Sequence, residues 1–193
     1  MKTPLLPQNE AERIAVLHDL LILDTEPEQR FDNVTAYAQS RFGVEIALVS
    51  LVDTDRQWFK SACGLDAKET PRNISFCGHA ILRDEVMIVQ NALKDERFFD
   101  NPLVAGAPFI RFYAGAPLKL SSGHAVGTLC LIDSKPKRLE IEEQEHLAVL
   151  AHMVAMELEH QGRIDDCREN CLYGHLPTKC PYQDTKYELP DAD

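Results

Sequence analysis

A chain of 193 residues with 45% hydrophobic and 26% charged residues is long enough to bury a core and has the composition of a globular domain. Its formal net charge of −11 argues against binding to nucleic acid or to an anionic membrane surface, because both need a surplus of Lys and Arg. We recognise no signal peptide and no apolar run of the roughly 18 residues that span a membrane, so we expect a cytoplasmic protein.

Two amphipathic helices are predicted at the start of the chain. The first begins after Asn9, a residue suited to an N-cap, and keeps one apolar stripe to about Leu23. The second opens near Pro27 and ends at Gly43, which suits a left-handed C-terminal cap.

The strand signals come in pairs separated by turns. Residues 44–52 are almost wholly apolar, as in a central strand covered on both faces, and residues 57–62 return as an antiparallel partner. Residues 86–89 form a short strand, and residues 110–118 and 125–132 form a second hairpin. Because the strands come in hairpins and not in βαβ units, the predicted class is α+β with an antiparallel sheet.

The stretch from Ser75 to Leu82 is the predicted wall of a binding cavity. It places the Cys77 thiol and the His79 imidazole two residues apart, and Ser75 can cap a short helix there. The long connection that follows, residues 91–109, carries further polar residues, and loops of this length are often functional. The candidate ligand-binding residues are Cys77, His79, Asp95, Arg97, Asn101, Arg111 and Tyr113.

Two interpretations of these residues remain open. In the first, they surround a small ligand, and the pair Arg97 and Arg111 suits an anionic one through bidentate contacts. In the second, Asp95 and the two arginines form a structural ion-pair network that holds the long connection down. Cys77 is then a small buried hydrophobic residue.

A final helix is expected from about Leu139 to His160, with Gly162 ending it. The segment beyond it has too few apolar residues for a core. Of the six cysteines, three lie in this tail, and with one histidine they form a candidate zinc site, because three thiolates and an imidazole are a legitimate tetrahedral set. The candidate metal ligands are Cys167, Cys171, His175 and Cys180. The alternative is a tail that binds no metal; no other cofactor is identified.

Seven blocks of the sequence resemble the GAF domain family, in the subtype that precedes diguanylate cyclase or histidine kinase domains in bacterial sensors. The blocks are Ile22–Glu28, Ala47–Asp53, Arg56–Ser61, Glu69–Arg72, Ser75–Ile81, Arg111–Leu118 and Val126–Asp133. The resemblance implies a GAF (profilin-like) fold, in which a six-stranded antiparallel sheet has helices on both sides and loops roof a small-molecule cavity. It covers about residues 10–161, so we expect a GAF domain in residues 1–161 and a cysteine-containing tail in 162–193.

The resemblance implies a non-enzymatic sensory module of signal transduction. It binds an unidentified small ligand, forms a homodimer through its first and last helices, and acts on a signalling partner in trans, since no output domain follows. The alternative is an enzyme similar to the free methionine-R-sulfoxide reductases, a GAF-like family that uses thiols near the cavity. Here Cys63, Cys77 and Cys130 are the available thiols. Some photosensory members attach a bilin through a Cys near a His, but the rest of their pattern is not recognisable.

Overall fold

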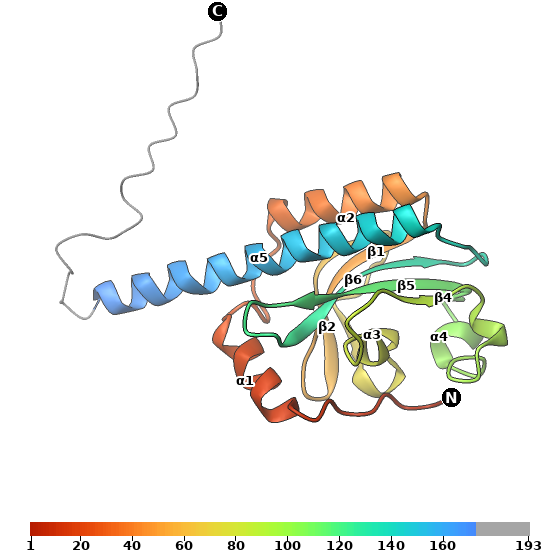
Figure 1. The fold of residues 1–193 in the computed structure, drawn as a ribbon, viewed down its shortest axis with the longest axis horizontal. Coiled ribbons are helices and arrows are strands. Elements are labelled where there is room, and N and C mark those ends of the chain that lie inside the picture. Colours follow the sequence, from red (N-terminus) through yellow and green to blue (C-terminus); the bar gives the residue numbers. More distant parts are fainter. Residues whose placement is uncertain (173–193) are drawn as a thin grey trace, which may run out of the picture.

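The centre of the molecule is a six-stranded antiparallel sheet with the strand order β3-β2-β1-β6-β5-β4 (Figure 1). The computed structural model describes the backbone of residues 1–172 and the side chains of residues 1–160. The strands are β1 (Ile46–Val52), β2 (Arg56–Cys63), β3 (Glu69–Pro71), β4 (Met87–Val89), β5 (Phe112–Lys119) and β6 (Ala125–Asp133). The α+β class and the antiparallel sheet expected from the sequence are confirmed.

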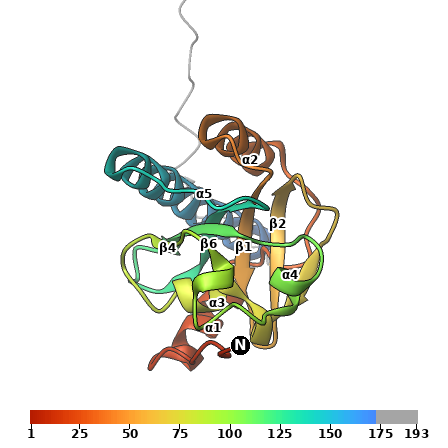
Figure 2. The same ribbon diagram turned by 90° about the vertical axis from the view of Figure 1, so that its right-hand side faces the viewer.

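Helices cover both faces of the sheet, as Figure 2 shows in a view from the side. The two long helices α2 and α5 lie together on one face, and α3 and α4 lie on the other; α1 packs near one end of β6. The helices are α1 (Glu10–Asp19), α2 (Gln29–Phe42), α3 (Phe76–Ala80), α4 (Pro102–Ala105) and α5 (Ile141–Leu172), with short 3₁₀ turns at Arg72–Ile74 and Ala92–Lys94.

The sheet therefore separates two hydrophobic cores. In β1, Ala47 and Val49 point to the core beneath α2 and α5, whereas Ile46 and Leu48 point to the core beneath α3. All seven residues of β1 are buried, which is why this strand reads as one continuous apolar run. The second core carries the candidate site.

Three boundaries differ from the sequence-based expectation. The strand β3 is not among the strands predicted from the sequence, because three residues ending in Pro71 give no periodic signal. The first helix ends at Asp19, and Leu21 then adopts a left-handed φ of 51°. The last helix does not end at Gly162 but continues to Leu172. Its glycine is a tolerated interior residue, since one glycine costs a helix only about 1 kcal/mol.

In the described part of the chain, we find no helix with the length and apolar character needed to cross a bilayer.

Candidate functional site

A cavity of about 290 Å³ lies between the lower face of the sheet, α3 and the segment around α4. Its lining comes from β1, β2, β5, β6, α3 and the two connections at residues 65–70 and 103–110. The lining residues are Leu48, Gln57, Phe59, Leu65, Ala67, Thr70, Phe76, Cys77, Leu103, Ala107, Pro108, Ile110, Tyr113 and Ile132. None of them is Asp, Glu, Lys, Arg or His, and polar side chains are few. The cavity is an apolar chamber with a small number of hydrogen-bonding groups.

The short helix α3 forms one wall of this cavity and is fixed by Ser75. The Ser75 hydroxyl accepts the Gly78 backbone N–H at 2.9 Å, so the predicted N-cap is confirmed. The same hydroxyl donates to the amide oxygen of Gln57, whose amide nitrogen donates to Thr70 Oγ1 at 2.6 Å. This chain of hydrogen bonds ties α3 to β2 and β3. No pattern in the sequence indicates that Gln57 and Thr70 belong to the wall.

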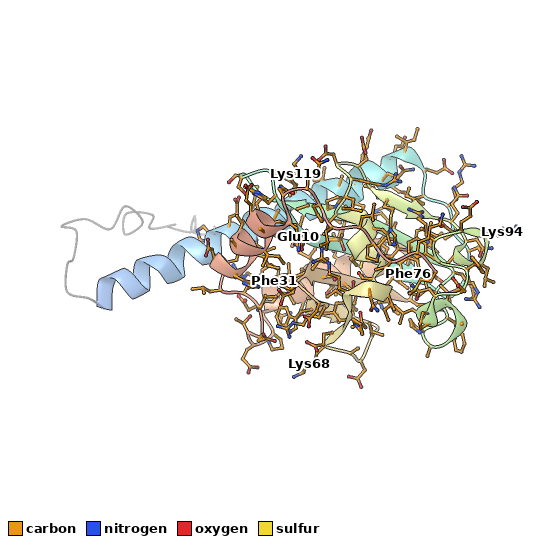
Figure 3. The ribbon with its side chains drawn as sticks, turned by 90° about the horizontal axis from the view of Figure 1, so that it is seen from below. Glu10, Phe31, Lys68, Phe76, Lys94 and Lys119 are labelled. Atoms are coloured by element: carbon orange, nitrogen blue, oxygen red, sulfur yellow. The ribbon has the colours of Figure 1, made fainter. Side chains whose placement is uncertain are left out.

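Aromatic stacking holds the other side of the wall. The rings of Phe76 and Phe98 stack with centroids 3.9 Å apart, and Tyr113 lies 5.1 Å from Phe76 in a tilted arrangement. Figure 3 shows Phe76 near the middle of the molecule on the face seen from below, whereas Lys94 and Lys119 project from its outline. The aromatic contacts join α3, β5 and the long connection, so the wall is built from segments far apart in the sequence.

A thiol and hydroxyl cluster lies where α3 meets the sheet. Tyr113 Oη donates to Cys77 Sγ at 3.4 Å, and Cys130 Sγ lies 3.8 Å from Cys77 Sγ. The neighbouring residues Ser50 and Thr128 face each other on β1 and β6, and both are fully buried. Within the described residues their hydroxyls have no hydrogen-bond partner, so both are free to turn toward a charge at the sulfur.

The cluster makes the two cysteines chemically unequal. Burial alone raises the pKa of Cys77, but four polar neighbours stabilise its thiolate and lower the pKa to about 6. Those neighbours are the Cys130 thiol and the hydroxyls of Thr128, Tyr113 and Ser50. The Cys77 sulfur and then burial hold the pKa of Cys130 well above its ordinary value, and burial likewise raises the pKa of Tyr113. Cys77 is therefore the more acidic thiol of the pair.

Of the seven predicted ligand-binding residues, the cavity is lined by Cys77 and Tyr113. Three of the others hold the outer side of the wall. Arg97 binds Asp95 through two hydrogen bonds of 2.9 and 2.7 Å, and this partner lowers the pKa of the Asp95 carboxyl. His79 Nε2 lies 2.9 Å from the backbone oxygen of Lys2, which brings the N-terminal segment beneath α3. Burial lowers the pKa of His79.

The remaining two predicted residues bind backbone groups. Asn101 caps α4 by accepting the Leu103 N–H at 2.9 Å, and its side-chain nitrogen donates to the Ile74 carbonyl at 2.9 Å. Arg111 donates to the backbone oxygen of Val104 at 2.9 Å and to other carbonyls of this connection. Asp95 and Arg97 thus form the ion pair that the structural interpretation expects, whereas Arg111 donates to backbone carbonyls and does not join that pair.

A second polar cluster, which sequence reasoning missed, lies at the turn between β1 and β2. Glu10 accepts hydrogen bonds from Arg13 at 2.8 Å and from Arg72, and both guanidinium groups are almost fully buried. Arg13 also donates to the Val52 carbonyl at 2.7 Å, and Arg72 to the Asp53 carbonyl at 2.8 Å. Burial opposes ionisation of Glu10, but the two arginines outweigh it and lower its pKa to about 2. We call Glu10, Arg13 and Arg72 the arginine hub.

The polar positions of several resemblance blocks meet beside this hub. Arg56 binds Asp24 at 2.6 Å, Glu69 at 2.6 Å and Asp53 at 3.3 Å. The pKa of Arg56 is raised above its ordinary value, first by the hydrogen bond to Asp24. These blocks therefore encode an ion-pair cluster at one end of the sheet, and none of its members lines the cavity.

The remaining candidate groups lie elsewhere. Cys63 donates to Gln39 of α2 at 3.2 Å, so it belongs to the opposite face from Cys77 and Cys130. Among the side chains that the structure describes, no group of three or more His, Cys, Asp or Glu residues is placed to hold a metal ion. The side chains of the four candidate zinc ligands, Cys167, Cys171, His175 and Cys180, lie outside the described residues.

Comparison with known sequences gives one relative of high similarity. The chain is 41% identical over 170 residues to the cyclic di-GMP phosphodiesterase PA2567 of Pseudomonas aeruginosa strain PAO1. The match covers 86% of this chain but only 29% of that protein. The activity in that protein's name therefore describes a chain much longer than the shared segment.

Solved structures share the fold at low identity. They include the GAF domain of a phosphoenolpyruvate-protein phosphotransferase from Coxiella burnetii, with a TM-score of 0.61 and 15% identity over 83% of this chain and 99% of that one. The free methionine-R-sulfoxide reductase of Neisseria meningitidis has a TM-score of 0.58 and 18% identity over 86% and 99%. A sequence model of the GAF domain matches residues 26–158. The sheet, its helices and this match together show that the chain belongs to the GAF domain family.

Proposed function

We propose that the chain is a non-catalytic sensory module that binds a small ligand in the cavity beneath α3. The cavity itself carries this proposal, because an apolar chamber with a few convergent polar groups is the usual form of a small-molecule site. The name of the Pseudomonas relative supports a place in nucleotide second-messenger signalling. The free thiols and the acidic net charge of the present chain support a cytoplasmic location.

The lining favours a neutral ligand with an apolar body. Among the described residues, no Lys, Arg or His side chain lines the cavity, so an anion would lose its hydration without gaining a counter-charge. Gln57 and Thr70 of the wall are hydrogen-bonded to each other, and two further groups are placed to meet a polar atom of the ligand: the Cys77 thiol and the Tyr113 hydroxyl. A volume of about 290 Å³ lies at the small end of ligand sites and suits a molecule of one or two rings.

Occupancy is transmitted through the sheet. The strands β5 and β6 contact α3 on one face and α5 on the other, so a shift of the cavity wall changes the surface on which α5 rests. On α5, Val149, Met153 and Met156 are more than half exposed and follow one another at helical spacing. We place the homodimer contact on this stripe, with a signalling partner acting in trans on the dimer.

Indole tests the cavity, since it is neutral, apolar and has a single N–H donor. We expect saturable binding by calorimetry and at least tenfold weaker binding of indole-3-acetate, which adds a carboxylate to the same ring system. Ala67→Trp fills the cavity and should abolish indole binding, whereas Ala36→Trp, at an exposed position on α2, should leave it unchanged. Equal binding by the two variants, or no binding by the wild type, would refute the proposal.

A second candidate function is thiol-dependent reduction of free methionine-R-sulfoxide. The 3.8 Å separation of the Cys77 and Cys130 sulfurs favours it. It ranks second because that substrate is a zwitterion and the described lining has no carboxylate, ammonium or guanidinium group to pair with its two charges. Turnover of methionine-R-sulfoxide with dithiothreitol, lost in Cys77→Ala and kept in Cys63→Ala, would establish this reaction; no turnover excludes it.

A further inference from the structure

The cysteine pair Cys77 and Cys130 has a use that ligand binding does not require. The two residues are 53 positions apart in the sequence, yet α3 and β6 bring their sulfur atoms within 3.8 Å of each other. Both are buried, and both belong to the core beneath α3. A disulfide has a sulfur–sulfur distance of about 2.05 Å, so the two sulfur atoms must approach each other by about 1.75 Å to form it.

The cavity gives one of the two thiols access to a reagent. Cys77 lines the cavity, whereas Cys130 lies behind it and is fully buried. The first oxidation must therefore occur at Cys77. This is also the thiol whose pKa is lowered, and the thiolate is the form that attacks an oxidant.

The hydroxyl groups around Cys77 can stabilise a negative charge on its sulfur. The Tyr113 hydroxyl already donates to Cys77. The hydroxyls of Ser50 and Thr128, which have no hydrogen-bond partner in the described part of the chain, lie beside it in a fully buried position. Buried hydroxyls without partners cost free energy unless some state of the protein uses them. A thiolate at Cys77, or the oxygen of a sulfenic acid there, would supply the missing acceptor.

We propose that Cys77 and Cys130 form a thiol-disulfide switch that is oxidised by a small organic hydroperoxide entering through the apolar cavity. The Cys77 thiolate attacks the terminal peroxide oxygen, the O–O bond breaks, and the alkoxide leaves as an alcohol after taking a proton. Cys77 is then a sulfenic acid. The Cys130 sulfur attacks Cys77 Sγ, the S–O bond breaks, and water leaves with the Cys130 proton. Two thiols have lost two electrons to one hydroperoxide.

The oxidised state alters the cavity wall. Closing the sulfur–sulfur distance from 3.8 Å draws the Cys77 side chain toward β6 and away from the cavity. It also removes the thiolate that accepts the Tyr113 hydroxyl, so the Cys77 and Tyr113 groups of the wall change together. Because α3 has only five residues, the movement shifts the helix as a whole. A dithiol reductant reverses the step by thiol-disulfide exchange.

The test uses the full chain with cumene hydroperoxide, followed by alkylation of the remaining thiols and tandem mass spectrometry of the peptides. The expected product is a Cys77–Cys130 cross-linked peptide that dithiothreitol removes. In Cys130→Ala, the sulfenic acid should persist at Cys77 and be trapped by dimedone. Cys63→Ala is the matched control and should leave the cross-link unchanged, since Cys63 lies on the other face of the sheet.

Two further measurements examine the route and the activation. Ala67→Trp, which fills the cavity, should slow oxidation by cumene hydroperoxide at least tenfold. Tyr113→Phe should slow it about threefold at about pH 5, below the pKa of Cys77, because a rise of about one unit in that pKa lowers the thiolate fraction about tenfold while nucleophilicity recovers about threefold. Urea unfolding checks that both variants are folded, through their free energy of unfolding.

The proposal would be overturned if the wild type formed no Cys77–Cys130 cross-link, or if Ala67→Trp formed the cross-link as fast as the wild type. The ligand-binding function is judged separately, because indole binding is measured on fully reduced protein. A chain that binds indole but resists the hydroperoxide keeps the sensory function and loses the switch; one that forms the cross-link but binds no indole does the reverse.

Discussion

Replacing Glu10 with Gln should destabilise the protein strongly, although Glu10 lies in an exterior helix far from the cavity. The Glu10 carboxylate accepts hydrogen bonds from both Arg13 and Arg72, whose side chains are 1% and 5% exposed. An amide retains one acceptor but no charge. The substitution therefore leaves two buried guanidinium groups without their shared counter-charge. One nitrogen of Arg72 has no hydrogen-bond partner among the described residues even in the wild type.

The size of the loss follows from the burial of the arginines. Breaking a buried ion pair by removing one partner costs 3–5 kcal/mol. The Glu10 side chain is 18% exposed, so solvent screens part of the interaction and we expect about 3 kcal/mol. For a chain of this size that corresponds to a fall of about 6–12 °C in Tm.

The pH dependence gives the sharper test. The pKa of Glu10 is about 2 in the folded protein against an ordinary value of 4.5. Between these values the unfolded chain binds more protons, so the stability that the Glu10 charge contributes is complete above about pH 4.5 and is lost as the pH falls toward 2. Urea unfolding should show that the difference in free energy of unfolding between the wild type and Glu10→Gln decreases as the pH falls from about 4.5 toward 2.

The matched control is Glu12→Gln, two residues along the same helix and 77% exposed. It should change the free energy of unfolding by less than about 0.5 kcal/mol. Suppose that Glu10→Gln lowers the free energy of unfolding by less than about 1 kcal/mol at pH 7, or by an amount that stays constant as the pH falls. Either result would show that the arginine hub does not depend on the Glu10 charge.

Three further substitutions probe the sheet, the cavity and the dimer contact. Gly127→Ala puts a Cβ 2.1 Å from the Ser50 backbone oxygen on the neighbouring strand, and urea unfolding should show a loss of about 3 kcal/mol. Gly115→Ala puts a Cβ 2.1 Å from the hydroxyl of Tyr113, so the phenol must move and indole binding should weaken at least tenfold by calorimetry. Met153→Glu should give a monomer in analytical ultracentrifugation while the free energy of unfolding changes by less than about 0.5 kcal/mol.

The architecture was predictable where the hydrophobic pattern is periodic or continuous. The apolar run of β1, the cap at Ser75 and the left-handed Gly43 each follow from local chemistry, and all three are confirmed. The strand β3 was not predictable, because its pairing with β2 depends on a partner thirteen residues away and its own three residues carry no pattern.

The candidate site was predictable only in part, and the reason lies in the long connection. Cys77 and Tyr113 follow from their places on α3 and β5, which fix the face they occupy. The presence of an arginine in the sequence does not show whether its side chain binds a ligand, a carboxylate or a backbone carbonyl. Arg97 meets Asp95, two residues away, and Arg111 meets carbonyls of a path that only the folded chain defines. The approach of Cys130 to Cys77 likewise depends on packing between β6 and α3.

The length of α5 has a mechanical consequence. Its 32 residues span about 48 Å at 1.5 Å per residue, so it extends well beyond the eight residues of β5 on which it packs (Figure 1). A tilt of about 10° at the sheet would displace a point about 20 Å further along such a rod by about 3.5 Å. A rotation at the sheet that leaves the hydrophobic core intact would therefore become a translation of several ångströms at the far end of the helix.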